Sequence, residues 1–562
     1  MRGEIKTESP LPAQAPCARR GWLAPALALF GASLAYFLFW LHGQPFFDDD
    51  YLRWLVPSRQ VRVGDILARI VTPVPGGWGF LDRPVILLFF KLFDTGFGPV
   101  PAWFYLGKSV IAAGTMALLF LLGRHFAARL PLPPRRQLFV ALIPPLLLLT
   151  AEPLFMSMLW LCDMEILAEF CLLLAVSLYV LYRTLGLHRQ RLRPLGLLLQ
   201  LLILCVAMVG FRTKSSARIL PALMFVHLLL VDRRALRHFL PLIGVLTFVN
   251  VPWSTLAHQP VPEFMSSAGT AQAPGFFWHL PELKFTLDIL LGDLRAFWPF
   301  SQTVLRPYGI VQLFLPFGGA ALLLAVAALV RSRAPAPASG AAAPAPGGAA
   351  DSLAVLAAIW LALALATLPI YPRIPYEMLS RYLVSSLLPA LLLLGALAGR
   401  AMAWPGAGRH LRPALTALLA CQCLAGLFQT YLRKIDTGAV MVMINGMMSH
   451  MEARYRDANV VFLGHGPFLY WPPARGNRHF WLLENTSDLF VRFDGIAAQG
   501  RPVYLVTTCP QENPRWEFVE AIAMPADAYS RALGLSQPRL ERYVYRLPAQ
   551  NLLDVPAQKA HP

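Results

Sequence analysis

Charged residues are scarce in this chain, and their scarcity excludes an ordinary soluble globular protein. Only 14% of the 562 residues are Asp, Glu, Lys or Arg, whereas 56% are hydrophobic and the mean hydropathy is +0.52. Soluble domains typically carry about 25% charged residues. Composition alone therefore predicts an integral membrane protein.

Acidic residues are rarer than basic ones, which leaves a formal net charge of +18. An excess of this size can indicate a protein that binds nucleic acid. Here, however, the basic residues form short clusters between apolar stretches rather than one continuous face. Such clusters are typical of cytoplasmic loops in membrane proteins, so we expect no nucleic-acid partner.

Two further signals are missing from the sequence. The seven cysteines are scattered, so they spell out neither a disulfide framework nor a zinc site. No cleavable signal peptide is apparent, because the first apolar stretch, Trp22 to Leu41, has about the length of a membrane-spanning helix. We expect it to be an anchor that stays in the protein.

Long apolar stretches dominate residues 22–432 and predict about 11 transmembrane helices. Basic residues gather before Trp22 and in every second connection, which places the tail of residues 1–21 and those connections in the cytoplasm. An odd number of spans puts the C-terminus outside. Two outward connections carry basic residues against this rule, and anion binding is one explanation; these residues are Arg53, Arg59, Arg62, Arg69, Arg212 and Lys214.

Composition changes at two places along the chain. Residues 331–351 include a run of Ala, Pro and Gly that cannot form a packed core, and they are predicted to be a flexible cytoplasmic linker. Residues 433–562 contain apolar runs of strand length between turn residues, which predicts an extracytoplasmic α/β domain. The predicted strands are centred on residues 460–463, 480–483, 503–506 and 543–545.

An acidic cluster, Asp48, Asp49 and Asp50, follows the first apolar stretch and opens an outward loop of residues 43–82. The acids could simply begin an interfacial helix, where carboxylates favour the N-terminus. A carboxylate there could also act as a general base on an acceptor hydroxyl. Alternatively, Asp48 and Asp49 could bind a divalent cation such as Mg²⁺ or Mn²⁺, with Asp50 in support.

This placement of acids resembles the GT-C superfamily of integral-membrane glycosyltransferases, in particular its protein O-mannosyltransferase and lipid A aminoarabinose transferase-like group. Other elements at predicted outward helix ends are similar to motifs of that group. They are Asp82-Arg83-Pro84 with Phe97-Gly98; Glu152-Pro153 with Trp160, Asp163 and Glu165; Phe211-Arg212-Thr213-Lys214-Ser215-Ser216; and Ser380-Arg381-Tyr382. The similarity covers roughly residues 22–400. The Trp-Trp-Asp element of the oligosaccharyltransferase branch is not found after Tyr431.

The resemblance implies an inverting transferase that moves a hexose or pentose from a polyprenyl-phosphate donor to a hydroxyl of a glycan, lipid or protein. It implies Asp49 as the general base, with Asp48 as the next choice. The remaining assignments are donor phosphate binding by Arg83, Lys214, Arg373 and Arg381, and acceptor or metal assistance by Asp50, Asp163 and Glu165. Each also has a simpler explanation, because arginine at a membrane boundary often snorkels and acids at a helix start often cap it.

Two other classes share this hydropathy. A lipid or sugar transporter or flippase would carry charges or helix breaks near the middle of paired spans. A membrane assembly protein without catalytic activity would tolerate replacement of Asp48 to Asp50. The glycosyltransferase is the favoured interpretation, and a bacterial inner membrane, with the C-terminal domain in the periplasm, is the expected location.

Overall fold

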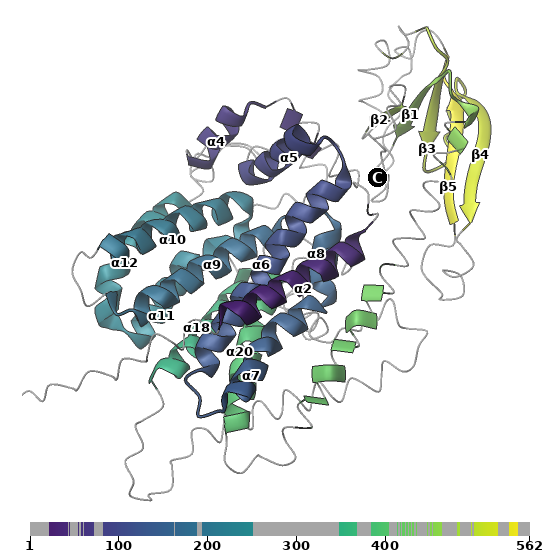
Figure 1. Cartoon of the computed structure of the whole chain (residues 1–562). Helices are drawn as coiled ribbons and strands as arrows, with labels where there is room; N and C mark the ends of the chain where they lie inside the picture. Colours follow the sequence, from purple (N-terminus) through teal and green to yellow (C-terminus); the bar gives the residue numbers. More distant parts are fainter. Residues whose placement is uncertain are drawn as a thin grey trace, which may run out of the picture.

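A computed structural model gives the structure of the chain, and its described residues are concentrated in a helical bundle and a small sheet (Figure 1). The described residues are 22–42, 44, 54–55, 58–59, 61–71, 83–161, 163–187, 194–250, 348–367, 384–403, short runs between 413 and 451, 453–463, 480–483, 496, 500–525 and 539–548.

The bundle is made of apolar helices packed around α6 (Pro101–Ala127), which contacts α2, α7, α9 and α20. Within the described part of the chain, five helices are long and apolar enough to cross a membrane, and α6 is the longest. The protein is thus a helical membrane protein with several spans. The other helices are α2 (Leu23–Leu41), α4 (Val63–Val71), α5 (Pro84–Phe97), α7 (Pro134–Leu149), α8 (Glu152–Leu159), α9 (Glu165–Thr184), α10 (Pro194–Thr213), α11 (Leu220–Val231), α12 (Arg233–Asn250), α18 (Gly348–Thr367) and α20 (Val384–Ala403).

Several helices begin and end where local chemistry favours it. Proline occupies one of the first helical positions of α5 and α6, where its missing N–H has no intrahelical acceptor to lose. Helix α6 ends with Arg124 and His125 in its last turn, a position where positive charge complements the helix dipole. Gly98 ends α5 with a φ of 73°, a left-handed conformation that glycine adopts without strain.

Helices α4 and α5 pack against each other and both contact α10 (Figure 1). Arg59 makes a bidentate ion pair with Asp94 of α5, at 2.8 Å for both hydrogen bonds. Arg212, in the last turn of α10, donates to the carbonyl oxygen of Ile70 at 3.3 Å. Arg59 and Arg212 are two of the basic residues in predicted outward connections, and their contacts help to hold α4, α5 and α10 together.

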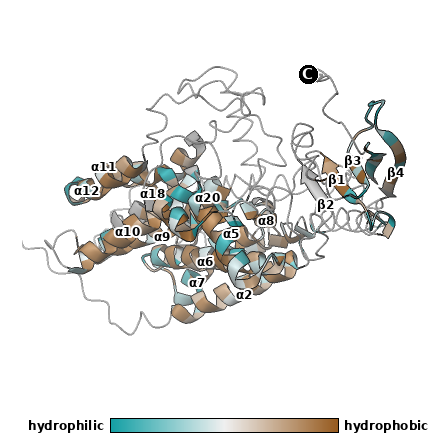
Figure 2. Cartoon of the chain, turned by 90° about the horizontal axis from the view of Figure 1, so that it is seen from above, coloured by the Kyte–Doolittle hydropathy of each residue, from teal (hydrophilic) through white to brown (hydrophobic). Residues whose placement is uncertain are grey.

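The hydropathy of the bundle helices agrees with a membrane environment. Hydrophobic residues dominate the bundle helices in Figure 2, and α10 carries exposed leucines, among them Leu197 and Leu201. Apolar side chains that face away from a protein core are normal where the surroundings are lipid.

The C-terminal sheet is mixed and has the order β2-β1-β3-β5-β4 in the described residues. Strands β2, β1 and β3 are parallel, whereas β5 is antiparallel to β3 and β4. A small core, including Val461, Leu505 and Tyr545, packs on the sheet. The bounds are β1 (Asn459–Leu463), β2 (Phe480–Leu483), β3 (Val503–Thr507), β4 (Glu517–Pro525) and β5 (Arg539–Arg546).

Three expectations from the sequence need correction or extension. Helix α18 begins at Gly348, so residues 348–351 belong to a helix rather than to the predicted linker, in keeping with the high helix propensity of Ala349 and Ala350. Helix α10 continues through Thr213, so the predicted third outward turn is a helix end followed by the 3₁₀ helix η4 (Ser215–Ile219). Strand β4 was not predicted.

Candidate active site

Lys214, which the sequence resemblance assigned to the donor phosphate, joins two acidic residues that it assigned to the acceptor or a metal, Asp163 and Glu165. Its Nζ lies 2.8 Å from Oδ1 of Asp163 and also forms an ion pair with Oε2 of Glu165. Lys214 follows the end of α10, while Asp163 and Glu165 flank the start of α9. The contact between these two helices brings the three side chains together.

Lys108 of α6 positions the segment that carries Asp163. Its ammonium donates to the backbone carbonyls of Ser157 at 2.5 Å, of Trp160, and of Asp163 at 2.6 Å. All three acceptors lie in the connection between α8 and α9 or at its edge. Lys108 therefore holds in place the backbone of the segment that carries Asp163 and leads into Glu165.

Glu169 extends the cluster one turn into α9, beside Glu165 and Lys214. Its side chain is fully buried, and the Ser216 hydroxyl lies near its carboxylate. A buried carboxylate in this situation is costly unless a ligand, a proton or a partner satisfies it.

The cluster is defined as Lys108, Asp163, Glu165, Glu169 and Lys214, and we call it the carboxylate–lysine cluster. Each member is at most 6% exposed, and one negative charge is in excess when all five are ionised. Burying ions costs several kcal/mol each, and well-packed apolar residues would often give equal or greater stability. Ionisable residues retained within a membrane bundle therefore indicate a functional site.

The ion pairs bear on the alternatives that the sequence left for Asp163 and Glu165. The residue before α9 that would cap it is Met164, and no side chain makes a capping hydrogen bond there. Both carboxylates contact Lys214 instead. Their pairing with an ammonium group favours a role in positioning charge over helix capping or direct ligation of a metal.

Among the other predicted residues, Arg83 is the only donor-phosphate candidate besides Lys214 that falls within the described residues. Arg83 is exposed and immediately precedes α5, whose first residue is Pro84. Helix α5 packs on α4, α6 and α10. Asp48, Asp49, Asp50, Arg373 and Arg381 lie outside the described residues, so their predicted roles remain predictions.

Sequence reasoning missed Lys108 and Glu169. Both stand inside apolar runs, and a lone ionisable residue in such a run is the signal that could have found them. No group of three or more His, Cys, Asp or Glu side chains is arranged to hold a metal ion in the part of the chain that the structure describes.

No family model and no curated protein matches the chain. The structure resembles ArnT from Cupriavidus metallidurans bound to undecaprenyl phosphate, with 14% identity, a TM-score of 0.38, and coverage of 95% of this chain and 98% of that one. ArnT from the same organism in the apo state gives 14% identity, a TM-score of 0.39, and coverage of 95% and 99%.

With a TM-score below 0.5 and 14% identity, no residue role is transferred from ArnT to this chain. The functional assignment has to come from the chain's own residues.

Proposed function

We propose that this protein is an integral-membrane glycosyltransferase that moves a sugar from a polyprenyl-phosphate donor to an acceptor hydroxyl at the extracytoplasmic surface. One observation carries the proposal: Asp163, Glu165 and Lys214, chosen from sequence for sugar-transfer roles, form one buried cluster at an end of the apolar bundle. The donor class itself comes from the sequence resemblance to the GT-C superfamily.

The chemistry assigned to the site requires a base, a cation for the leaving phosphate and an oriented acceptor. Asp49, or Asp48, accepts the proton from the acceptor hydroxyl as its oxygen attacks the sugar carbon and the polyprenyl phosphate leaves. Arg83, Arg373 and Arg381 are the proposed phosphate-binding residues, because guanidinium matches phosphate geometry. Lys214, first assigned to the same role, is better placed to hold Asp163 and Glu165 toward the acceptor.

The position of charges favours an enzyme over a transporter. In the five described spans, every Asp, Glu, Lys and Arg lies within about two turns of a helix end. A transporter would be expected to place such groups near the middle of its spans. The arrangement suits a reaction at the membrane surface, where the donor phosphate lies at headgroup level.

The proposal is tested by replacing the carboxylates of the first outward loop one at a time. In cells lacking the protein, the lipid-linked donor should accumulate, and mass spectrometry of lipid-linked sugars should identify it. Transfer from that donor is then measured in membranes carrying D48N, D49N or K214Q. Asp65, an exposed acid of α4 in the same loop, provides the matched control D65N.

We expect D49N or D48N to reduce transfer about 100-fold or more, since positioned general bases contribute about 10²–10⁴ in rate. K214Q should also reduce transfer strongly, because it leaves two buried carboxylates without their cation. D65N should transfer like the wild type. Full transfer by both D48N and D49N would reject the base assignment, and a lipid-linked sugar pool unchanged by loss of the protein would reject the glycosyltransferase.

A further inference from the structure

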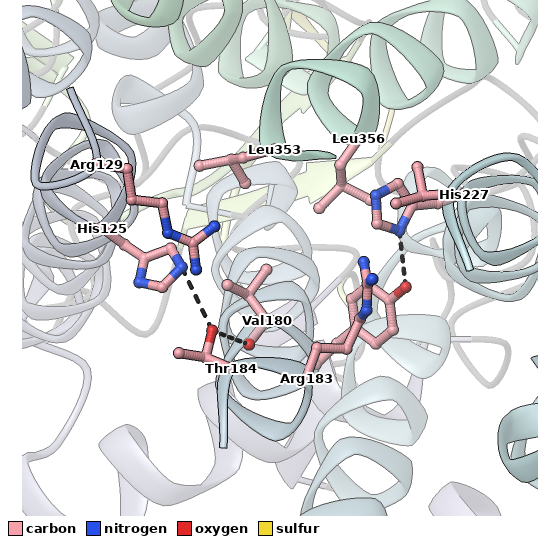
Figure 3. A pocket seen from close by; sticks show the side chains of 10 residues that line it. His125, Arg129, Val180, Arg183, Thr184, His227, Leu353 and Leu356 are labelled. Atoms are coloured by element: carbon pink, nitrogen blue, oxygen red, sulfur yellow. Dashed lines mark hydrogen bonds between the residues drawn. The ribbon is translucent and has the colours of Figure 1, made fainter. Parts of the chain in front are cut away.

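Helix α9, which carries two acids of the carboxylate–lysine cluster, is held at its far end by contacts to two other helices (Figure 3). The Tyr179 hydroxyl is 2.7 Å from Nδ1 of His227 on α11, and Oγ1 of Thr184 is 3.4 Å from Nε2 of His125 on α6. These four residues line a cavity about 15 Å along the helix from Glu169, so the cavity is separate from the cluster. Anchored in this way, α9 is a fixed support for the acids at its start.

Glu165 and Glu169 lie four residues apart in α9, so their side chains project from the same face of the helix. Both side chains are buried. Glu165 forms an ion pair with Lys214, and the carboxylate of Glu169 lies near the Ser216 hydroxyl. Two successive acids on one face of α9 therefore meet two nearby residues of the same segment.

Lys214 stands at a junction between two helices. Its N–H donates to the carbonyl oxygen of Gly210 at 3.0 Å, as expected at the end of α10. Its own backbone is extended, with φ −159° and ψ 155°, and η4 begins at the next residue and leads directly into α11. Because Lys214 has no helical conformation of its own, the position of η4 helps to set the direction of its side chain.

Small residues bring this junction close to α9. A Cβ at Gly210 would lie 3.1 Å from the Cβ atoms of both Cys171 on α9 and Ala217 on η4. Ser216 and Ala217 are both buried. In an interior packed this closely, a polar contact such as that between Ser216 and Glu169 can adopt only a narrow range of geometries.

We propose that Glu169 and Ser216 are positioning residues for Lys214. Their contact fixes the start of η4 against α9, and this sets the place where the Lys214 ammonium pairs with Asp163 and Glu165. A carboxylate one turn deeper in the apolar bundle is costly to bury, and holding this junction in place gives it a role. The expected effect on sugar transfer rests on the proposed function, whereas the effect on the position of η4 does not.

The first arm of the test measures the position of η4 without reference to activity. Backbone hydrogen exchange is followed by mass spectrometry in the full chain purified in detergent, in the peptide that covers residues 214–219. The variant S216A removes the hydroxyl, and E169L removes the carboxylate while keeping a side chain of similar size. The matched control is S177A on α9, where the Ser177 hydroxyl donates to the carbonyl of Leu173 in its own helix at 2.7 Å.

We expect this peptide to exchange at least about tenfold faster in S216A and E169L than in the wild type and S177A, since losing one hydrogen bond to a charged group corresponds to about a tenfold change in local opening. If E169L does not fold, S216A decides alone. Unchanged exchange in S216A overturns the proposal, whatever the protein transfers.

The second arm measures transfer in membranes, using the lipid-linked donor that accumulates in cells lacking the protein. S216A should lower transfer about tenfold by itself but add nothing in the K214Q background, with incubations long enough to quantify the slower variants, because it acts through Lys214. E169Q, which keeps an oxygen for Ser216 to contact, should lose less transfer than E169L. A loss by the same factor in both backgrounds indicates a merely structural role and overturns the proposal. If the wild type transfers no sugar, the proposed function fails and the exchange arm alone decides the positioning role.

Discussion

At the scale of single residues, Lys108 has the clearest structural role. It is fully buried in α6, and its ammonium donates to three backbone carbonyls around the connection between α8 and α9. Lys108 therefore holds the connection between α8 and α9 in place, although Lys108 itself belongs to a different helix, α6.

We predict that Lys108→Met destabilises the protein by at least about 3 kcal/mol, because hydrogen bonds to charged groups contribute about 1.5–3 kcal/mol each and the buried carbonyls would be left unpaired. The melting temperature of the detergent-purified protein provides the measurement. Lys91→Met is the control, since Lys91 is only partly buried and donates to the carbonyl of Arg59 at 3.2 Å. Equal melting temperatures for the two variants would contradict the role given to Lys108.

Sequence reasoning found part of this site because some of its residues interrupt the hydrophobic pattern at predicted helix ends. Asp163, Glu165 and Lys214 stood out for that reason. Their mutual contact could not be predicted, because it depends on how α9 packs against α10. Lys108 and Glu169 were overlooked because each is surrounded by apolar neighbours along the chain.

At the scale of elements, close approaches between helices depend on glycine. Gly426 lies in the apolar helical segment Leu419–Phe428, called the last apolar segment here, and a Cβ at Gly426 would overlap the backbone carbonyl of Thr150 at the end of α7. Gly31 of α2, by contrast, has nothing within 4 Å of the position that a Cβ would take. The same substitution should therefore have opposite consequences at the two sites.

We predict that Gly426→Ala lowers the melting temperature, because backbone atoms rather than a flexible side chain would have to move. Gly31→Ala should leave it unchanged or raise it slightly, since alanine is favoured over glycine in a helix by about 1 kcal/mol. Thermal unfolding of both purified variants checks the pair. A tolerated Gly426→Ala would show that the contact between α7 and the last apolar segment is looser than described.

Some strands can be predicted from their own sequence, whereas one depends on its partner strand. The four predicted runs fall in β1, β2, β3 and β5, because each is rich in apolar and aromatic residues. Strand β4 has Phe518, Val519 and Ile522, but Glu520 and two alanines interrupt them, so no apolar run of strand length stands out. Its pairing with β5 is a long-range contact that the local sequence does not show.

At the scale of the whole molecule, the fold class followed from composition, whereas the number of spans did not. The five described spans agree with a helical membrane protein, and the total of 11 remains a prediction. Orientation is a further prediction from the basic clusters. It places α4 and α5 outside and the start of α7 in the cytoplasm.

Cysteine labelling in intact cells tests this orientation. In a background with all seven native cysteines replaced, V63C on α4 should react with a membrane-impermeant maleimide added from outside. R135C at the start of α7 should react only after the membrane is permeabilised. Both positions are exposed, so access depends on the side of the membrane. Labelling of R135C but not V63C in intact cells would reverse the topology and remove the proposed active site from the outer surface.

The shared ammonium of Lys214 also constrains how the sequence can change over evolutionary time. Because one cation balances Asp163 and Glu165 in a space without solvent, exchanging it alone leaves two anions facing each other. Viable substitutions must therefore arrive in combination, with a lost positive charge matched by a lost negative one. Related chains should vary jointly at these three positions, and the effects of single and double replacements should depart strongly from simple addition.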